Sequence, residues 1–172
     1  MAIDYASLVR DIPDFPQKGI IFRDITPLLG DGAAFQSAVK DMAAPFREAG
    51  IDQVVAIEAR GYLLGAPLAI ELGAGFVPVR KVGKLPFRTY KAEYALEYGE
   101  AAIEMHQDGV LDHHRVLLVD DVLATGGTMA ATLSLVEQAG ASVVGIAVLI
   151  ELAALNGRQA IFGHDVVSLI TL

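Results

Sequence analysis

One stretch of the sequence decides the fold: Val116-Leu117-Leu118-Val119-Asp120-Asp121-Val122-Leu123-Ala124-Thr125-Gly126-Gly127-Thr128. It runs from an apolar segment that ends abruptly at two adjacent carboxylates, through a Thr-Gly-Gly-Thr turn, into a segment of helical periodicity. A buried strand followed by a turn and a helix is the repeating unit of α/β domains. Because ligands of such domains bind beyond the carboxyl ends of the parallel strands, we expect a site at this turn.

The same alternation of strands and helices extends to both sides of this stretch. Strands are expected at 53–57, 75–79, 115–119, 142–150 and 166–172, and helices at 33–49, 62–72 and 127–139. The strands are continuous apolar runs, which is typical of strands that helices cover on both faces. The sequence therefore predicts one α/β domain over residues 1–172, with a central, mostly parallel sheet flanked by helices.

Two segments fall outside this alternation. Residues 1–32 contain Ile12-Pro13-Asp14-Phe15-Pro16, which is too proline-rich for regular structure and indicates a small N-terminal hood over the sheet. Residues 80–107 begin with a basic segment, and residues 87–98, which are polar, aromatic and not clearly periodic, suit a mobile lid. Five of the thirteen Lys and Arg residues lie within twelve positions that hold no acid: Arg80, Lys81, Lys84, Arg88 and Lys91. This cluster predicts a local anion site, and the alternative is a solvated charged surface.

Composition excludes several classes of function. The 172 residues include no cysteine, which excludes thiol catalysis, Cys-ligated zinc, iron–sulfur clusters and disulfides. The net charge of -8 argues against general affinity for nucleic acid or anionic membranes. The first residues lack the basic-then-apolar pattern of a signal peptide, and the longest uncharged stretch, 122–136, is too short and too polar to span a bilayer. We therefore expect a cytoplasmic protein, and the spacing of the four histidines predicts no metal site of its own.

The Thr-Gly-Gly-Thr turn has the features of a phosphate-binding loop. Gly126 and Gly127 let backbone N–H groups approach an anion, the flanking threonines add hydroxyl donors, and the helix N-terminus adds about half a positive charge. Asp120 and Asp121 would repel a phosphate alone, but they can accept hydrogen bonds from the vicinal hydroxyls of a sugar phosphate such as ribose 5-phosphate. They would also stabilise positive charge that develops on the sugar ring. The plainer alternative is a strand end followed by a helix cap.

With four other segments, this stretch resembles the type I phosphoribosyltransferases, and within them the adenine-specific members. The segments are Gly19-Ile20-Ile21-Phe22-Arg23-Asp24-Ile25-Thr26, Glu58-Ala59-Arg60-Gly61-Tyr62-Leu63-Leu64-Gly65-Ala66-Pro67, Val79-Arg80-Lys81-Val82-Gly83-Lys84-Leu85-Pro86 and Leu96-Glu97-Tyr98-Gly99. The likeness covers roughly residues 12–152 in the correct order. It implies the type I phosphoribosyltransferase fold, with a small N-terminal hood and a mobile catalytic loop. It also implies an enzyme of purine salvage that converts adenine and 5-phosphoribosyl 1-diphosphate (PRPP) to AMP and pyrophosphate.

The resemblance also implies roles for individual residues. The 5′-phosphate would be bound by Ala124, Thr125, Gly126, Gly127 and Thr128, and the pyrophosphate by Ala59, Arg60, Arg80, Lys81 and Lys84. Adenine would contact Ile21, Phe22, Arg23 and Val122, and the catalytic residues would be Glu97, Asp120 and Asp121. Glu97 would manage a proton at the purine, and Arg80 would reach in from a partner subunit, which implies a homodimer. Magnesium would arrive mainly on PRPP, with few direct protein ligands.

Other interpretations stay open at this point. Arg60 could be a surface residue, Glu97 an ordinary solvated glutamate and Phe22 part of the core. Val122 stands where the family usually has leucine, Tyr62 where phenylalanine is frequent and Ala95 where serine is common, which leaves the ranking of bases in doubt. The alternative functions are a transferase for hypoxanthine, guanine, xanthine or a pyrimidine, and a non-catalytic PRPP-binding regulator. A structural α/β protein with a fortuitous phosphate turn is the third.

Overall fold

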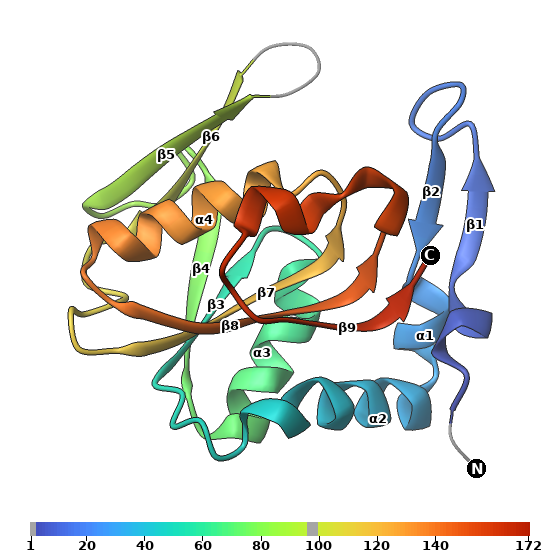
Figure 1. Cartoon of the computed structure of the whole chain (residues 1–172), viewed down its shortest axis with the longest axis horizontal. Coiled ribbons are helices and arrows are strands. Elements are labelled where there is room, and N and C mark those ends of the chain that lie inside the picture. The colour runs from blue at the N-terminus through green and yellow to red at the C-terminus, as the bar shows by residue number, and fades with distance from the viewer. Residues whose placement is uncertain (1–2, 96–99) are drawn as a thin grey trace.

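The computed structural model of this chain describes residues 3–95 and 100–172. Its centre is a seven-stranded sheet of order β5-β6-β4-β3-β7-β8-β9, with helices on both faces (Figure 1). Five strands run parallel: β3 (Gln53–Ile57), β4 (Gly75–Lys81), β7 (Arg115–Leu123), β8 (Ser142–Glu151) and β9 (Val166–Thr171). At one edge β5 (Thr89–Ala95) and β6 (Glu100–His106) are antiparallel. The predicted central, mostly parallel sheet flanked by helices is confirmed.

The sheet separates two apolar cores. On one face α2 (Gly32–Ala43) and α3 (Gly61–Leu72) bury side chains such as Met42, Leu64 and Leu68. On the other face α4 (Gly127–Gln138) buries Met129, Leu133 and Val136, the residues of one helical face. Each strand serves both cores by alternation. The sequence therefore reads as continuous apolar runs because neither face of the central strands meets water.

Local signals in the sequence set the ends of the helices. Asp31 begins α2, because its carboxylate accepts the N–H groups of Ala33 at 3.0 Å and Ala34 at 3.1 Å. The helix expected over 33–49 ends at Ala43 and continues as the short turn η2 (Ala44–Phe46), which contains Pro45. The remaining short helices are α1 (Thr26–Gly30), η1 (Tyr5–Leu8), η3 (Ala153–Leu155) and η4 (Gly157–Ile161).

The N-terminal segment contains more regular structure than the sequence predicts. Two strands, β1 (Arg10–Pro13) and β2 (Ile21–Asp24), form an antiparallel ribbon that stands beside the main sheet (Figure 1). The prediction that Ile12-Pro13-Asp14-Phe15-Pro16 lacks regular structure is therefore wrong for its first two residues. Proline is tolerated at the end of an edge strand because no second neighbour needs its missing N–H.

The segment expected to be an irregular lid is in large part a β-hairpin. Thr89–Ala95 form β5 and pair with β6. The side chains of Tyr90, Ala92 and Tyr94 pack against the core, while Lys91 and Glu93 are exposed. This alternation is the two-residue period of a strand that is buried on one face. Its buried positions hold tyrosine and alanine rather than large aliphatic residues, and its exposed positions are charged. Leu96-Glu97-Tyr98-Gly99 lies outside the described residues, so a mobile lid stays a prediction.

No helix in the described parts of the chain combines the length and the apolar character that crossing a lipid bilayer requires.

Candidate active site

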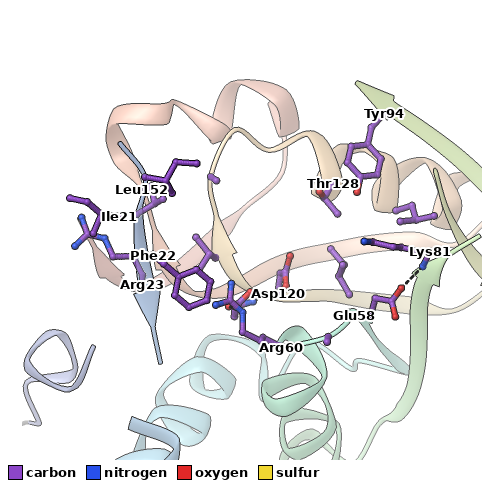
Figure 2. A pocket seen from close by; sticks show the side chains of 17 residues that line it. Ile21, Phe22, Arg23, Glu58, Arg60, Lys81, Tyr94, Asp120, Thr128 and Leu152 are labelled. Carbon is purple, nitrogen blue, oxygen red and sulfur yellow. Dashed lines mark hydrogen bonds and ion pairs between the residues drawn. The ribbon is translucent and has the colours of Figure 1, made fainter. Parts of the chain in front are cut away.

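A cavity of about 380 Å³ opens at the carboxyl ends of the central strands, where the sequence predicts the site. It is lined by Ile20, Ile21, Phe22, Arg23, Ile57, Glu58, Ala59, Arg60, Lys81, Tyr94, Ile103, Asp120, Asp121, Val122, Ala124, Thr128 and Leu152. Figure 2 shows an apolar group that includes Phe22 and Leu152 at one end and a group that includes Lys81 and Thr128 at the other. Asp120 and Arg60 lie between these two groups (Figure 2). The cavity therefore has an apolar end, a middle with Asp120 and Arg60, and an end with a lysine and a threonine hydroxyl.

The two aspartates lie within β7 rather than after it. The sequence predicts that the strand ends abruptly at Asp120, but hydrogen bonding to β8 continues through Leu123. The backbone N–H of Asp121 donates to Asp120 Oδ1 at 2.9 Å. Asp121 is 5% exposed, and its Oδ2 lies 2.7 Å from Nε of Arg60, close enough for an ion pair but not aligned as a hydrogen bond. The strand thus holds two rigid carboxylates at the cavity.

Both carboxylates are electrostatically costly in the unliganded protein. Burial raises the pKa of Asp120 well above its usual range, and the charge of Asp121 raises it further. Burial also raises the pKa of Asp121, although the Arg60 guanidinium opposes this effect. Two adjacent carboxylates with one arginine beside Asp121 favour a ligand that brings hydroxyl donors or positive charge.

The Thr-Gly-Gly-Thr turn lines a second, smaller cavity of about 70 Å³ beside Asp120. Gly126 precedes α4 with φ +86°, a backbone conformation that favours glycine. A Cβ on Gly126 would lie 2.4 Å from the carbonyl oxygen of Gly157, so no other residue fits without a shift. Gly126, the residue before α4, has no side chain to cap the helix, so within the described residues the first backbone N–H groups of α4 are available to an anion. All five residues expected to bind the 5′-phosphate line this cavity: Ala124, Thr125, Gly126, Gly127 and Thr128.

Arg60 connects the hood to the acidic residues. It lies at the start of α3, and its Cζ is 4.6 Å from the centroid of the Phe22 ring, in a cation–π contact. Its Nη1 is buried and has no hydrogen-bond partner among residues 3–95 and 100–172. Arg60 lines the cavity together with Ala59, the two residues expected at the pyrophosphate, and the alternative of an ordinary surface residue does not describe it.

The hood supplies the apolar end of the cavity. Ile21, Phe22 and Arg23 of β2 line the cavity, as does Val122 of β7. The guanidinium of Arg23 pairs with Asp11 across the hairpin, which leaves its backbone and its neighbours to face the cavity. All four residues expected at adenine thus line the same cavity.

The basic segment divides into residues inside and outside this cavity. Lys81 lines it, whereas Arg80 and Lys84 do not. Glu58 accepts the backbone N–H of Lys81 at 2.5 Å and Nε of Arg80 at 3.1 Å (Figure 2 shows the Lys81 contact). Burial alone would raise the pKa of Glu58, but these two donors hold it below its usual range. Glu97 lies outside the described residues.

A buried glutamate that the sequence analysis did not identify fixes the basic segment. Glu104 is 3% exposed, and its Oε1 accepts the N–H groups of Gly83, Lys84 and Leu85 at 2.9, 3.0 and 2.9 Å. Its Oε2 accepts the hydroxyl of Thr89 at 3.1 Å. Burial alone would raise the pKa of Glu104, but the four hydrogen bonds lower it. The loop that carries Lys84 is therefore held by a carboxylate in β6.

The hydroxyl of Tyr62 explains one departure from the family pattern. It donates to the carbonyl oxygen of Val79 at 2.8 Å and so ties α3 to β4. Burial, and then the charge of Glu58, raise the pKa of Tyr62 to about 12. The tyrosine is thus a structural residue beside the site and does not line the cavity.

Comparison with known proteins agrees with this geometry. Residues 29–168 match the family model of the phosphoribosyl transferase domain. The chain is 54% identical over 168 residues to an adenine phosphoribosyltransferase of Symbiobacterium thermophilum, which covers 98% of this chain and 99% of that protein.

Two solved structures show the same fold. One is the crystal structure of an adenine phosphoribosyltransferase from Thermoanaerobacter pseudethanolicus, with a TM-score of 0.95 and 50% identity over 98% of both chains. The other is the Saccharomyces cerevisiae adenine phosphoribosyltransferase complexed with D-2,5-dideoxy-2,5-imino-altritol 1,6-bisphosphate and adenine, with a TM-score of 0.91 and 38% identity over 96% of both chains. By sequence and by fold, this chain belongs to the phosphoribosyltransferase family.

Proposed function

We propose that this protein is an adenine phosphoribosyltransferase, which converts adenine and PRPP to AMP and pyrophosphate. The observation that carries the proposal is the arrangement of two adjacent cavities: an apolar end suits the base, the two aspartates suit the ribose, and the Thr-Gly-Gly-Thr turn and Lys81 suit the phosphates. The identity of 54% with a relative of that name supports the same activity.

The phosphoribosyl group is held at its two ends. The 5′-phosphate accepts hydrogen bonds from the N-terminus of α4 and from Thr125 and Thr128, which line the smaller cavity. Asp120 and Asp121 accept hydrogen bonds from the ribose hydroxyls, which adds donors to two carboxylates whose pKa values are raised by burial. The sugar is thereby fixed with its C1 atom between the base and the pyrophosphate.

The transfer breaks the bond from C1 to the pyrophosphate and forms a bond from C1 to N9 of adenine. Positive charge develops on the ring as the first bond breaks, and the two rigid carboxylates stabilise it. Glu97 takes up the proton that leaves adenine. The pyrophosphate leaves with its electron pair toward the turn at Ala59 and Arg60 and toward Lys81.

Magnesium is proposed to enter with PRPP. Protein-bound Mg²⁺ is usually held by one or two carboxylates together with substrate phosphates and waters. The buried Oδ2 of Asp121 without an aligned hydrogen bond, beside Asp120, fits that donor set. No cluster of three or more His, Asp or Glu residues suited to a metal occurs among the described residues. When bound, the ion neutralises part of the charge on the diphosphate.

Adenine is selected by backbone groups of β2 near Ile21 and Arg23. A backbone N–H and C=O pair matches the N1 acceptor and the 6-amino donor of adenine, whereas hypoxanthine and guanine present the opposite polarity there. Each reversed contact leaves a buried group unpaired at a cost of about 1–3 kcal/mol. Val122 and Leu152 add apolar surface on the faces of the base.

We also propose a homodimer in which Arg80 and Lys84 serve the pyrophosphate of the partner subunit. Both belong to the segment fixed by Glu58 and Glu104, yet neither lines the cavity of its own chain. A cytoplasmic location is proposed as well, because the highly charged PRPP and AMP do not cross membranes unaided.

The dimer proposal is tested by mixing two inactive variants. One chain carries Arg80→Gln, and the other carries Asp120→Asn with Asp121→Asn. If Arg80 acts across the interface, mixed dimers contain one site with both intact parts, and activity returns on mixing. Activity that stays absent in demonstrated mixed dimers contradicts the arrangement.

The activity is tested directly by incubating the protein with PRPP, magnesium and equimolar adenine, hypoxanthine, guanine and xanthine. We expect AMP and pyrophosphate to form in equal amounts while the other bases remain. A preference for another base would identify a transferase of different specificity. PRPP binding without any nucleotide product would indicate a regulator.

A further inference from the structure

The short helix η4, near the C-terminus, packs against the Thr-Gly-Gly-Thr turn. It lines neither cavity of the site. A Cβ on Gly126 would lie 2.4 Å from the Gly157 carbonyl oxygen and 2.8 Å from Cβ of Ala160. A Cβ on Gly157 would lie 2.3 Å from the carbonyl oxygen of Ala124. The two backbones therefore touch with no side chain between them, and a shift of η4 displaces the turn.

One ion pair fixes η4 to the sheet. Arg158 Nε and Nη2 lie 2.7 Å from Glu151 Oε1 and Oε2, respectively, which is a two-pronged contact. Nη1 of the same guanidinium donates to the carbonyl oxygen of Val166 in β9 at 3.2 Å. Glu151 Oε2 also accepts the hydroxyl of Ser168 at 2.9 Å. Since Glu151 is the last residue of β8, and Val166 and Ser168 belong to β9, the network joins η4 to two neighbouring strands of the sheet.

This pair is more constrained than an ordinary surface ion pair. The Glu151 side chain is 12% exposed, and the hydrogen bond from Arg158 holds the pKa of this glutamate below its usual range. A second ion pair, Arg47 with Glu71, has a single contact of 2.6 Å and is more exposed at its carboxylate, 28%. Most exposed pairs of that kind contribute little to stability. It lines neither cavity of the site and serves as a matched control.

We propose that Arg158 and Glu151 are positioning residues for the 5′-phosphate, acting through the backbone contact of Gly157 with Gly126. This inference rests on the proposed function. The donors of an anion site must be held within a few tenths of an ångström of their working positions, and the turn has glycines rather than side chains to hold it. The ion pair behind η4 supplies the missing rigidity.

The inference predicts a selective loss of binding. With Arg158→Gln, affinity for ribose 5-phosphate falls about tenfold or more, and KM for PRPP rises with it. Affinity for magnesium pyrophosphate, which does not use the turn, changes by no more than about twofold. Arg158→Lys keeps the charge without the two-pronged contact and gives an intermediate loss. Arg47→Gln leaves both affinities unchanged.

Calorimetric titration of each variant with ribose 5-phosphate and, separately, with magnesium pyrophosphate measures this selectivity. Thermal melting checks that each variant is folded. If Arg158→Gln does not fold, Ser168→Ala removes one contact to Glu151, and its affinity for ribose 5-phosphate must still fall relative to that for pyrophosphate. Equal losses for both ligands, or no loss in a folded Arg158 variant, overturn the inference. If the wild-type protein binds pyrophosphate but not ribose 5-phosphate, the proposed function itself is wrong.

Discussion

The substitution Gly126→Ala tests whether the turn before α4 binds the 5′-phosphate. Gly126 has φ +86°, and a Cβ there would meet the Gly157 carbonyl oxygen at 2.4 Å and Cβ of Ala160 at 2.8 Å. The first distance is roughly 1 Å short of ordinary van der Waals contact, and a backbone atom cannot move aside as a flexible side chain can. The turn or η4 must therefore shift.

The expected magnitudes follow from that distance. A displacement of about 1 Å in a binding group costs about 100-fold in kcat/KM for PRPP. Overpacking adds about 1–3 kcal/mol of destabilisation. The left-handed backbone conformation adds about 1 kcal/mol of destabilisation. The two effects together lower Tm by on the order of 10 °C.

The chain offers a matched control in Gly163→Ala. Gly163 has φ +92° and nothing within 4 Å of the position of a Cβ, so this variant carries the backbone penalty without the clash. We expect it to keep its activity and to lose about 1 kcal/mol of stability. Steady-state kinetics with PRPP as the varied substrate and thermal melting of both variants measure the difference. A Gly126→Ala variant with the kcat/KM of Gly163→Ala would refute the role of the turn.

Three further predictions concern the carboxylates. Asp120→Asn with Asp121→Asn lowers kcat/KM at least about 100-fold, whereas Tm stays close to that of the wild type because burial disfavours both charges. AMP formation at the wild-type rate by that folded variant contradicts the ribose assignment. Because the pKa of Asp120 is raised, its contribution to the free energy of unfolding falls as pH rises from the ordinary carboxyl pKa to the raised one, and affinity for ribose 5-phosphate grows over the same range. Unfolding and ribose 5-phosphate binding are measured over a series of pH values. The same pH dependence in the double asparagine variant as in the wild type would contradict the prediction. Glu104→Gln lowers the free energy of unfolding, measured in urea, by about 1–3 kcal/mol. The lowered pKa of Glu104 means that its charge stabilises the fold above the ordinary carboxyl pKa, and that this stability is lost as pH falls through the lowered pKa. An unchanged free energy of unfolding would mean that the charge of Glu104 is not used.

The parts of the site that are contiguous in sequence could be predicted. Asp120 through Thr128 carry the acids, the glycines and the helix start within one stretch, and the structure brings them to one place. The central strands could also be predicted, because a continuous apolar run indicates a buried strand even when its neighbours in the sheet are unknown. The end of β7 was misjudged, since a strand can continue through Asp120 and Asp121 when β8 supplies the hydrogen bonds.

The supporting residues could not be predicted because their partners are distant in the chain. Glu104 binds Gly83, which is 21 positions away, and nothing around it in sequence indicates burial. Glu58 precedes Ala59 and Arg60 directly after a strand, a position that could have identified it. The hairpin of β5 was missed because its two-residue period uses tyrosine and alanine on the buried face.

A crystal structure with ribose 5-phosphate bound tests the central claim most directly. We expect the phosphate to bind at the N-terminus of α4, between Thr125 and Thr128, and the sugar hydroxyls to donate to Asp120 and Asp121. A sugar bound elsewhere, or a phosphate held by the basic segment while the turn stays empty, would contradict it.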